Sequence, residues 1–163
     1  MIFNFNDFLE VDLEPTSAIF RHLRRVLQQA YFLHFMSPKD LDKMMTCLRA
    51  VRVFKGYKII RQGDPGDAFY LIASGRVSVW VNKGNTQVRV AGLRSDEYFG
   101  EMALISNEPR NATVLAEMLT ELFILEKHNF DNLLMKNPGI AQKLRLAHEQ
   151  RGEIMSNLVQ SQV

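Results

Sequence analysis

The stretch FGEMALISNEPRNATV, from Phe99 to Val114, combines a glycine, a carboxylate and an arginine with a short apolar run between them. Gly100 lets the backbone approach a ligand closely, because it has no Cβ. The run that starts at Glu101 is long enough for one helical turn, and the free N–H groups at the start of such a turn attract an anion. Arg110 supplies a permanent positive charge and a planar set of donors suited to phosphate oxygens. The stretch therefore predicts a phosphate site.

Glu101 adds a requirement of a different kind. A carboxylate beside a bound anion needs a donor as its partner, and a sugar hydroxyl is such a donor. Asn111, Ala112 and Thr113, which follow the arginine, are small enough to let a phosphate lie close to the chain. Together these residues predict an acceptor for a ribose beside a cradle for one phosphate, and a cyclic nucleotide carries both groups.

Two motifs of the chain resemble a known family. FGEMAL followed by PRNAT resembles the phosphate-binding cassette of cyclic nucleotide-binding domains, a superfamily that includes protein kinase A regulatory subunits, cyclic nucleotide-gated channels and bacterial catabolite activator proteins. RQGDPGDAFYLIASGRVSV, from Arg61 to Val79, resembles the glycine-punctuated hairpin region that precedes this cassette in the family. The likeness covers residues 35–135, and the cassette is most similar to those of bacterial channels, which often read GEMALIS.

The resemblance implies a set of ligand-binding residues. In the family a C-terminal helix closes over the bound base as a lid, and one polar or cationic residue of that helix caps the base. Gln150 and Arg151 are the expected capping positions, although Arg151 could equally be a salt-bridged surface residue. The expected ligand-binding residues are Val79, Phe99, Gly100, Glu101, Met102, Ala103, Arg110, Asn111, Ala112, Thr113, Gln150 and Arg151.

One residue departs from the family's pattern. The position after the cassette arginine is usually alanine, serine or threonine, and here it is Asn111. A threonine at that point favours cyclic GMP in the family, and Asn111 neither clearly mimics nor clearly excludes this. The expected ligand is therefore cyclic AMP, with cyclic GMP as the alternative, and no metal is expected.

The composition limits what else the chain can be. Its 163 residues suit one domain, and 47% hydrophobic with 23% charged residues is typical of a soluble globular protein. A net charge of +2 does not require a nucleic-acid partner. The single cysteine, Cys47, cannot form an internal disulfide. No apolar run reaches the roughly 20 residues of a membrane helix, and the start MIFNFNDFLEVDLE lacks the basic beginning of a secretory signal. We therefore expect a cytoplasmic protein, or a cytoplasmic piece of a larger one.

The N-terminal third is expected to be helical. Residues 1–15 would form an extension and residues 16–50 a helical segment, in which a first helix runs from Thr16 to about His34. A second helix should begin at Ser37 as N-cap, with Pro38 at its first position and Asp40 in its first turn, and run to about Arg49.

Short alternating apolar runs without helices between them fill residues 51–126. They predict an antiparallel β-roll, or jelly roll, in an α+β fold, interrupted by the cassette at residues 99–114. Val79, and also Val90, would then face the sugar or base of a ligand.

Residues 127–163 are expected to form two C-terminal helices: a short one over residues 129–136, and a long one capped by Asn137 with Pro138 at its first position. The long helix has three open interpretations: it packs along its own domain, it forms a homodimer, or it is the lid that the resemblance implies.

Enzymatic activity is not expected. The histidines His22, His34, His128 and His148 all lie outside the predicted roll, and no nucleophile is paired with a base in the sequence.

The sequence thus favours a regulatory module that binds cyclic AMP and signals through its lid helices to a protein partner. Nothing after the lid helix resembles the DNA-binding helices of catabolite activators. The alternative is an interaction scaffold whose pocket no longer binds a nucleotide.

Overall fold

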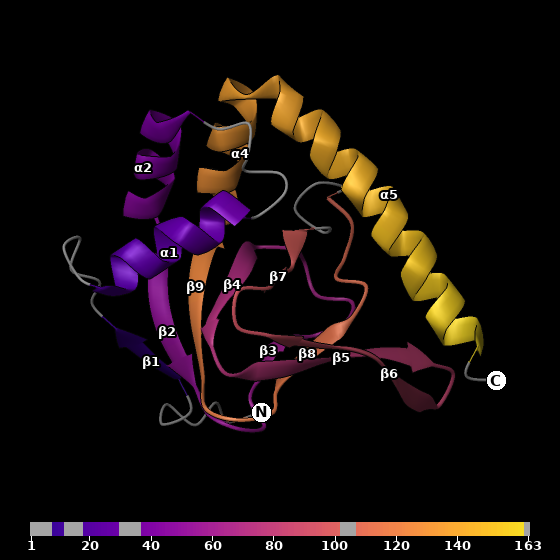
Figure 1. Ribbon diagram of the computed structural model, residues 1–163. Helices are drawn as coiled ribbons and strands as arrows, with labels where there is room; N and C mark the ends of the chain where they lie inside the picture. The colour runs from indigo at the N-terminus through magenta and orange to yellow at the C-terminus, as the bar shows by residue number, and fades with distance from the viewer. Residues whose placement is uncertain (1–7, 12–17, 30–36, 102–106, 162–163) are drawn as a thin grey trace.

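The computed structural model describes residues 8–11, 18–29, 37–101 and 107–161. Two antiparallel β-sheets face each other, with helices over one face and at the C-terminal end (Figure 1). Along the chain the elements are β1 (Phe8–Val11), α1 (Ala18–Gln29), α2 (Pro38–Thr46), β2 (Arg49–Val53), β3 (Lys58–Ile60), β4 (Ala68–Ser74), β5 (Arg76–Lys83), β6 (Thr86–Arg94), β7 (Tyr98–Phe99), β8 (Thr113–Ala116), β9 (Thr120–Glu126), α4 (Lys127–Lys136) and α5 (Pro138–Ser161). This arrangement confirms the predicted α+β fold with its β-roll.

The two sheets have the strand orders β1-β2-β9-β4-β7 and β3-β8-β5-β6. Successive side chains of a strand point to opposite faces, so each strand can serve two layers. In β4, Tyr70 and Ile72 face the second sheet and join one core cluster, whereas Phe69 and Leu71 face the helices and join another. The five-stranded sheet is therefore buried on both faces at its centre.

The helical layer packs on the outer face of the five-stranded sheet (Figure 1). Leu23 and Leu27 of α1 and Met45 of α2 are all but fully buried there, together with Phe130 of α4. Burying a side chain of this size stabilises a fold by about 1.5–3 kcal/mol.

The predicted start of α2 is confirmed. The Ser37 hydroxyl oxygen accepts from the Asp40 backbone N–H at 3.1 Å, and Pro38 opens the helix. The helix ends at Thr46, earlier than the predicted Arg49, because Arg49 begins β2, where it is the strand partner of Ile124.

The N-terminal strand β1 was not predicted. Phe8–Val11 pairs antiparallel with β2 at the edge of the five-stranded sheet, in the register Phe8 opposite Val53 and Val11 opposite Ala50. Its four residues are too few to show the alternation by which the longer strands are recognised.

Asn137 joins the two C-terminal helices. Its side-chain amide donates to the Leu133 carbonyl oxygen at 3.2 Å, so the side chain closes the end of α4. Its own carbonyl oxygen accepts from the Ala141 N–H at 3.4 Å, as expected of the residue before α5. The prediction that Asn137 caps the second helix thus holds for its backbone and not for its side chain. From this joint α5 extends along one side of the molecule and contacts β6 (Figure 1).

Two connections between the sheets matter for the site. Residues 61–67 lead from β3 to β4, and the stretch that contains the cassette leads from β7 to β8, so both pass from one sheet to the other. Within the described residues, no helix is long and apolar enough to cross a membrane.

Candidate functional site

Gly100 directly follows β7 and has a φ of 89°, in the region that residues with a Cβ rarely adopt. A Cβ built on it would lie 3.0 Å from Arg110 Nη1, 3.1 Å from the Ala68 carbonyl oxygen and 3.2 Å from the Tyr70 ring. Both the conformation and the close approach therefore require glycine here.

Arg110 is buried beside this glycine, with 5% of its surface exposed. Its Nη1 donates to the Gly100 carbonyl oxygen, and its Nη2 donates to the Ala68 carbonyl oxygen at 2.6 Å. Nη2 also lies 3.3 Å from Asp67 Oδ1, and the guanidinium carbon is 5.9 Å from the centre of the Tyr70 ring. The guanidinium is thus fixed in place before any ligand arrives.

The charge of Arg110 is only partly balanced by these partners. Two of them are neutral carbonyl groups, and the carboxylate side chain of Asp67 is 81% exposed, so water screens it. Burying a cation is costly unless it is paired with an anion. The site is therefore electrostatically suited to an incoming anion.

The turn before β4 is bonded to the end of the cassette. Gln62 N–H donates to Thr113 Oγ1 at 3.0 Å, Gly63 N–H donates to the Arg110 carbonyl oxygen at 2.8 Å, and Arg110 N–H donates to the Asp64 carbonyl oxygen at 2.7 Å. The two motifs that resemble the family in sequence thus form one structural unit. The Thr113 hydroxyl, expected to bind ligand, has a structural role as an acceptor and keeps its proton available for donation.

The ring of Tyr70 packs beside the guanidinium of Arg110. Tyr70 is the strand partner of Phe99, and the two rings stack at 5.0 Å with an angle of 6° between their planes. Burial, aided by the nearby carboxylate of Asp67, raises the pKa of Tyr70 to about 12, so the phenol is neutral at physiological pH.

The other predicted site residues are distributed as follows. Phe99, Glu101 and Ala112 are buried, with 4%, 3% and 5% of their surfaces exposed, whereas Asn111 is exposed. Val79 is buried between the sheets, opposite Val114 of β8 and in the same core cluster as Phe99 and Ala112. Met102 and Ala103 lie outside the described residues.

Gln150 and Arg151 both lie in α5, and Gln150 is exposed. Among the other helices and strands, α5 packs chiefly against α4 and β6. The capping role of these two residues stays a prediction.

Sequence reasoning missed three residues that position Arg110: Asp67, Ala68 and Tyr70. All three lie in the DAFY segment of the earlier motif. A carboxylate at the start of a strand, followed three residues later by an aromatic ring, was the available signal.

Two hollows border this cluster. A groove of about 170 Å³ reaches Arg110 itself, between Asp64, Asp67 and Tyr70. A larger cavity of about 610 Å³ borders Asp67, Ala68 and Tyr70 too, and most of its other walls belong to β2, β9 and α4. Arg110 itself lines the smaller groove and not the larger cavity. The described residues contain no group of three or more histidine, cysteine or acidic side chains that could hold a metal ion.

Fold and site together define a β-roll with a connection built to hold an anion. Residues 50–137 match the family model described as cyclic nucleotide-binding domain, and they make up more than half of the chain. The chain therefore belongs to the cyclic nucleotide-binding domain family, as the sequence motifs predicted.

Known relatives agree with this assignment. The chain is 31% identical over 138 residues to a cAMP-dependent protein kinase regulatory subunit of Hypocrea atroviridis, covering 85% of this chain and 29% of that protein. It is 30% identical over 123 residues to a cGMP-dependent protein kinase of Toxoplasma gondii, covering 75% of this chain and 12% of that protein. The solved regulatory domain of Toxoplasma gondii PKA with cAMP superposes with a TM-score of 0.70 at 28% identity, covering 78% of this chain and 48% of that chain. The chain thus spans under a third of each of these two curated relatives, and it is a cyclic nucleotide-binding regulatory domain similar to theirs.

Proposed function

We propose that this domain binds cyclic AMP at the cassette and signals the binding to a protein partner through α4 and α5. The observation that carries the proposal is the buried guanidinium of Arg110, held by the carbonyl oxygens of Gly100 and Ala68 and only partly neutralised by Asp67. Such a group is pre-organised for a phosphate monoanion, because no further ordering is needed when the anion binds.

Each cassette residue has a role in this proposal. Arg110 binds the phosphate, and the buried carboxylate of Glu101 accepts from a ribose hydroxyl. Gly100 lets the guanidinium of Arg110 pack close to the backbone, and Val79 and Ala112 supply apolar surface for the sugar or base. The remaining proposed contacts are those of Phe99, Met102, Ala103, Asn111 and Thr113.

Binding can act as a switch only through a preference for one conformation. Shifting a two-state equilibrium almost completely takes roughly 5.5 kcal/mol of differential binding. Each hydrogen bond to a charged group contributes about 1.5–3 kcal/mol, so the guanidinium together with base contacts from a lid reaches this range.

The lid in this proposal is α5, which would swing about the Asn137–Pro138 joint until Gln150 or Arg151 caps the base. The bond from Asn137 to Leu133 supports a defined joint at this point. A kinase catalytic subunit is the first partner to test, because the Hypocrea relative is named as a kinase regulatory subunit. A homodimer through α5 is the second arrangement to test.

Titration calorimetry of the chain with cyclic AMP, cyclic GMP and, as a control, AMP tests the proposal. We expect micromolar or tighter binding of cyclic AMP, weaker binding of cyclic GMP and none of AMP. Tighter binding of cyclic GMP would reverse the nucleotide preference while keeping the site. No binding of either cyclic nucleotide would overturn the proposal and favour the scaffold alternative.

A further inference from the structure

Two turns at one end of the sheets carry exposed apolar side chains. Phe54, in the β2–β3 turn, is 38% exposed, and Met118 and Leu119, in the β8–β9 turn, are each 46% exposed. Scattered single apolar residues are normal on a surface, but a group of them marks an interaction site.

Backbone pairing holds these two turns side by side. Gly56 N–H donates to the Ala116 carbonyl oxygen at 2.8 Å, and Ala116 N–H donates to the Tyr57 carbonyl oxygen at 3.0 Å. In the five-stranded sheet Val53 is the strand partner of Thr120. Phe54 follows Val53 and Leu119 precedes Thr120, so these two residues lie just beyond the last paired residues of β2 and β9. The three apolar side chains therefore belong to one patch.

The β2–β3 turn and the first residue of β3 carry unbalanced positive charge. Lys55 and Lys58 are exposed, and neither forms an ion pair with another described residue. The nearby acids are already paired: Glu121 lies 2.6 Å from Arg52, and Glu117 lies 2.8 Å from Arg76 and 3.2 Å from Arg89. We call Phe54, Lys55, Lys58, Met118 and Leu119 the basic–apolar tip.

We propose that the basic–apolar tip docks on a lipid bilayer that contains anionic lipids. Its apolar side chains would enter the headgroup region, and its two lysines would lie against the anionic headgroups. A second copy of the chain is a poorer occupant, because three side chains cannot supply the ~800 Å² per partner of a standard protein interface.

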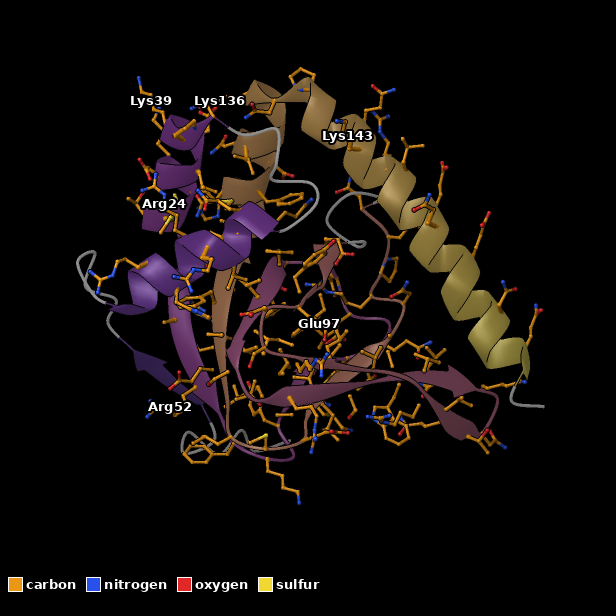
Figure 2. The ribbon with its side chains drawn as sticks, viewed as in Figure 1. Arg24, Lys39, Arg52, Glu97, Lys136 and Lys143 are labelled. Carbon is orange, nitrogen blue, oxygen red and sulfur yellow. The ribbon has the colours of Figure 1, made fainter. Side chains whose placement is uncertain are left out.

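The position of the tip suits such docking. The turns lie at the lower end of the molecule in Figure 1, whereas α2 and α4 lie at the upper end. Figure 2 shows Lys39 and Lys136 at that helical end and Arg52 toward the opposite end. Docking through the tip would leave α2 and α4 directed away from the bilayer, whatever the ligand of the cassette is, so the proposal does not rest on the proposed function.

Co-sedimentation of the full chain with phosphatidylcholine vesicles, with and without phosphatidylserine, tests the proposal at low and high salt. Two variants probe the tip, and two others serve as controls. Phe54→Ser with Leu119→Ser removes apolar contacts, and Lys55→Glu with Lys58→Glu reverses the charge. Lys39→Glu with Lys136→Glu makes the same change in net charge at the helical end, and Met135→Ser, at a position that is 81% exposed, is the apolar control.

We expect the wild type to bind the phosphatidylserine vesicles at least tenfold more strongly than the neutral ones, and less strongly at high salt. Lys55→Glu with Lys58→Glu should lose at least tenfold in binding, since each basic residue near an anionic surface contributes about fivefold. Phe54→Ser with Leu119→Ser should also lose at least tenfold, because membrane binding scales with the apolar area that enters the headgroup region. Both control variants should bind like the wild type, and circular dichroism should show all variants folded. Equal binding to neutral and acidic vesicles, or equal loss in tip and control variants, would overturn the proposal. Self-association that the tip variants abolish, without vesicle binding, would overturn it in favour of contact between chains.

Discussion

The guanidinium of Arg110 donates to the carbonyl oxygen of Gly100, ten residues earlier in the chain. The glycine and the arginine of the cassette therefore contact each other directly. A Cβ at position 100 would lie 3.0 Å from Arg110 Nη1, tighter than ordinary packing, and the guanidinium in turn fixes the carbonyl that follows β7.

Replacing Arg110 with alanine should weaken cyclic AMP binding at least about tenfold, or ~1.4 kcal/mol. The change should also lower the free energy of unfolding by about 1–3 kcal/mol, because it leaves the buried carbonyl oxygen of Ala68 without this donor. Arg110→Lys keeps the charge but loses the planar set of donors, so we expect an intermediate effect on both. Calorimetry and urea unfolding measure the two effects, and unchanged affinity would remove Arg110 from the site.

Gly100→Ala and Gly56→Ala form a matched pair. Their φ values are 89° and 91°, but a Cβ meets nothing within 4 Å at Gly56, whereas it meets three close atoms at Gly100. We expect Gly56→Ala to destabilise the fold by about 1–2 kcal/mol through its backbone alone. Gly100→Ala should lose roughly 1–3 kcal/mol more from crowding, and it should weaken nucleotide binding. Equal losses in thermal unfolding would mean that the close packing around Gly100 contributes nothing.

Thr113→Val should lower the free energy of unfolding by about 1 kcal/mol, because Gln62 N–H loses its acceptor. Thr113→Ser keeps the hydroxyl and should behave nearly like the wild type. Chemical unfolding of the two variants measures their free energies of unfolding. A valine variant as stable as the serine variant would show that the bond from Gln62 to Thr113 does not stabilise the fold.

We expect the fold to lose stability at high pH, because the pKa of Tyr70 is raised in the folded protein. Its pKa is raised from 10.0 to about 12 in the folded protein, so above pH 10 the unfolded chain releases this proton first and the folded state binds more protons. Stability should therefore fall between pH 10 and pH 12, by at most about 3 kcal/mol from this residue. Below pH 10 both states keep the proton and Tyr70 adds no pH dependence.

Tyr70→Phe keeps the stack on Phe99 and removes the ionisable hydroxyl. In denaturant titrations across the alkaline range its stability should fall less steeply than that of the wild type. Parallel curves for the two proteins would show that Tyr70 does not ionise differently in the folded and unfolded states.

The parts of the fold that the sequence predicted are those set by neighbouring residues. The start of α2 depends on Ser37, Pro38 and Asp40, which lie within four positions of one another. The alternation in the longer strands was likewise visible before any contact was known. The cassette was recognised because its residue types occur in a fixed order.

The features that could not be predicted from the sequence depend on residues far apart in the chain. The strand β1 exists because β2 offers it an edge, and the bond from Asn137 to Leu133 depends on the end of α4. The contact between Asp67 and Arg110 joins residues 43 positions apart. The spacing of Asp67 and Tyr70 was visible in the sequence, but no local pattern records their contact with Arg110, so Asp67, Ala68 and Tyr70 were missed.

The backbone hydrogen bonds of Arg110 with Gly63 and Asp64 join the connection from β3 to β4 to the connection from β7 to β8. These backbone amides should therefore open together, as one cooperative unit, and exchange their hydrogens with solvent at a common rate. A ligand that binds the Arg110 side chain would slow exchange at Gly63 as well, because the Gly63 N–H donates to the Arg110 carbonyl oxygen. The domain would in this way report occupancy of its cassette far along the chain, by loss of local opening and without any large displacement.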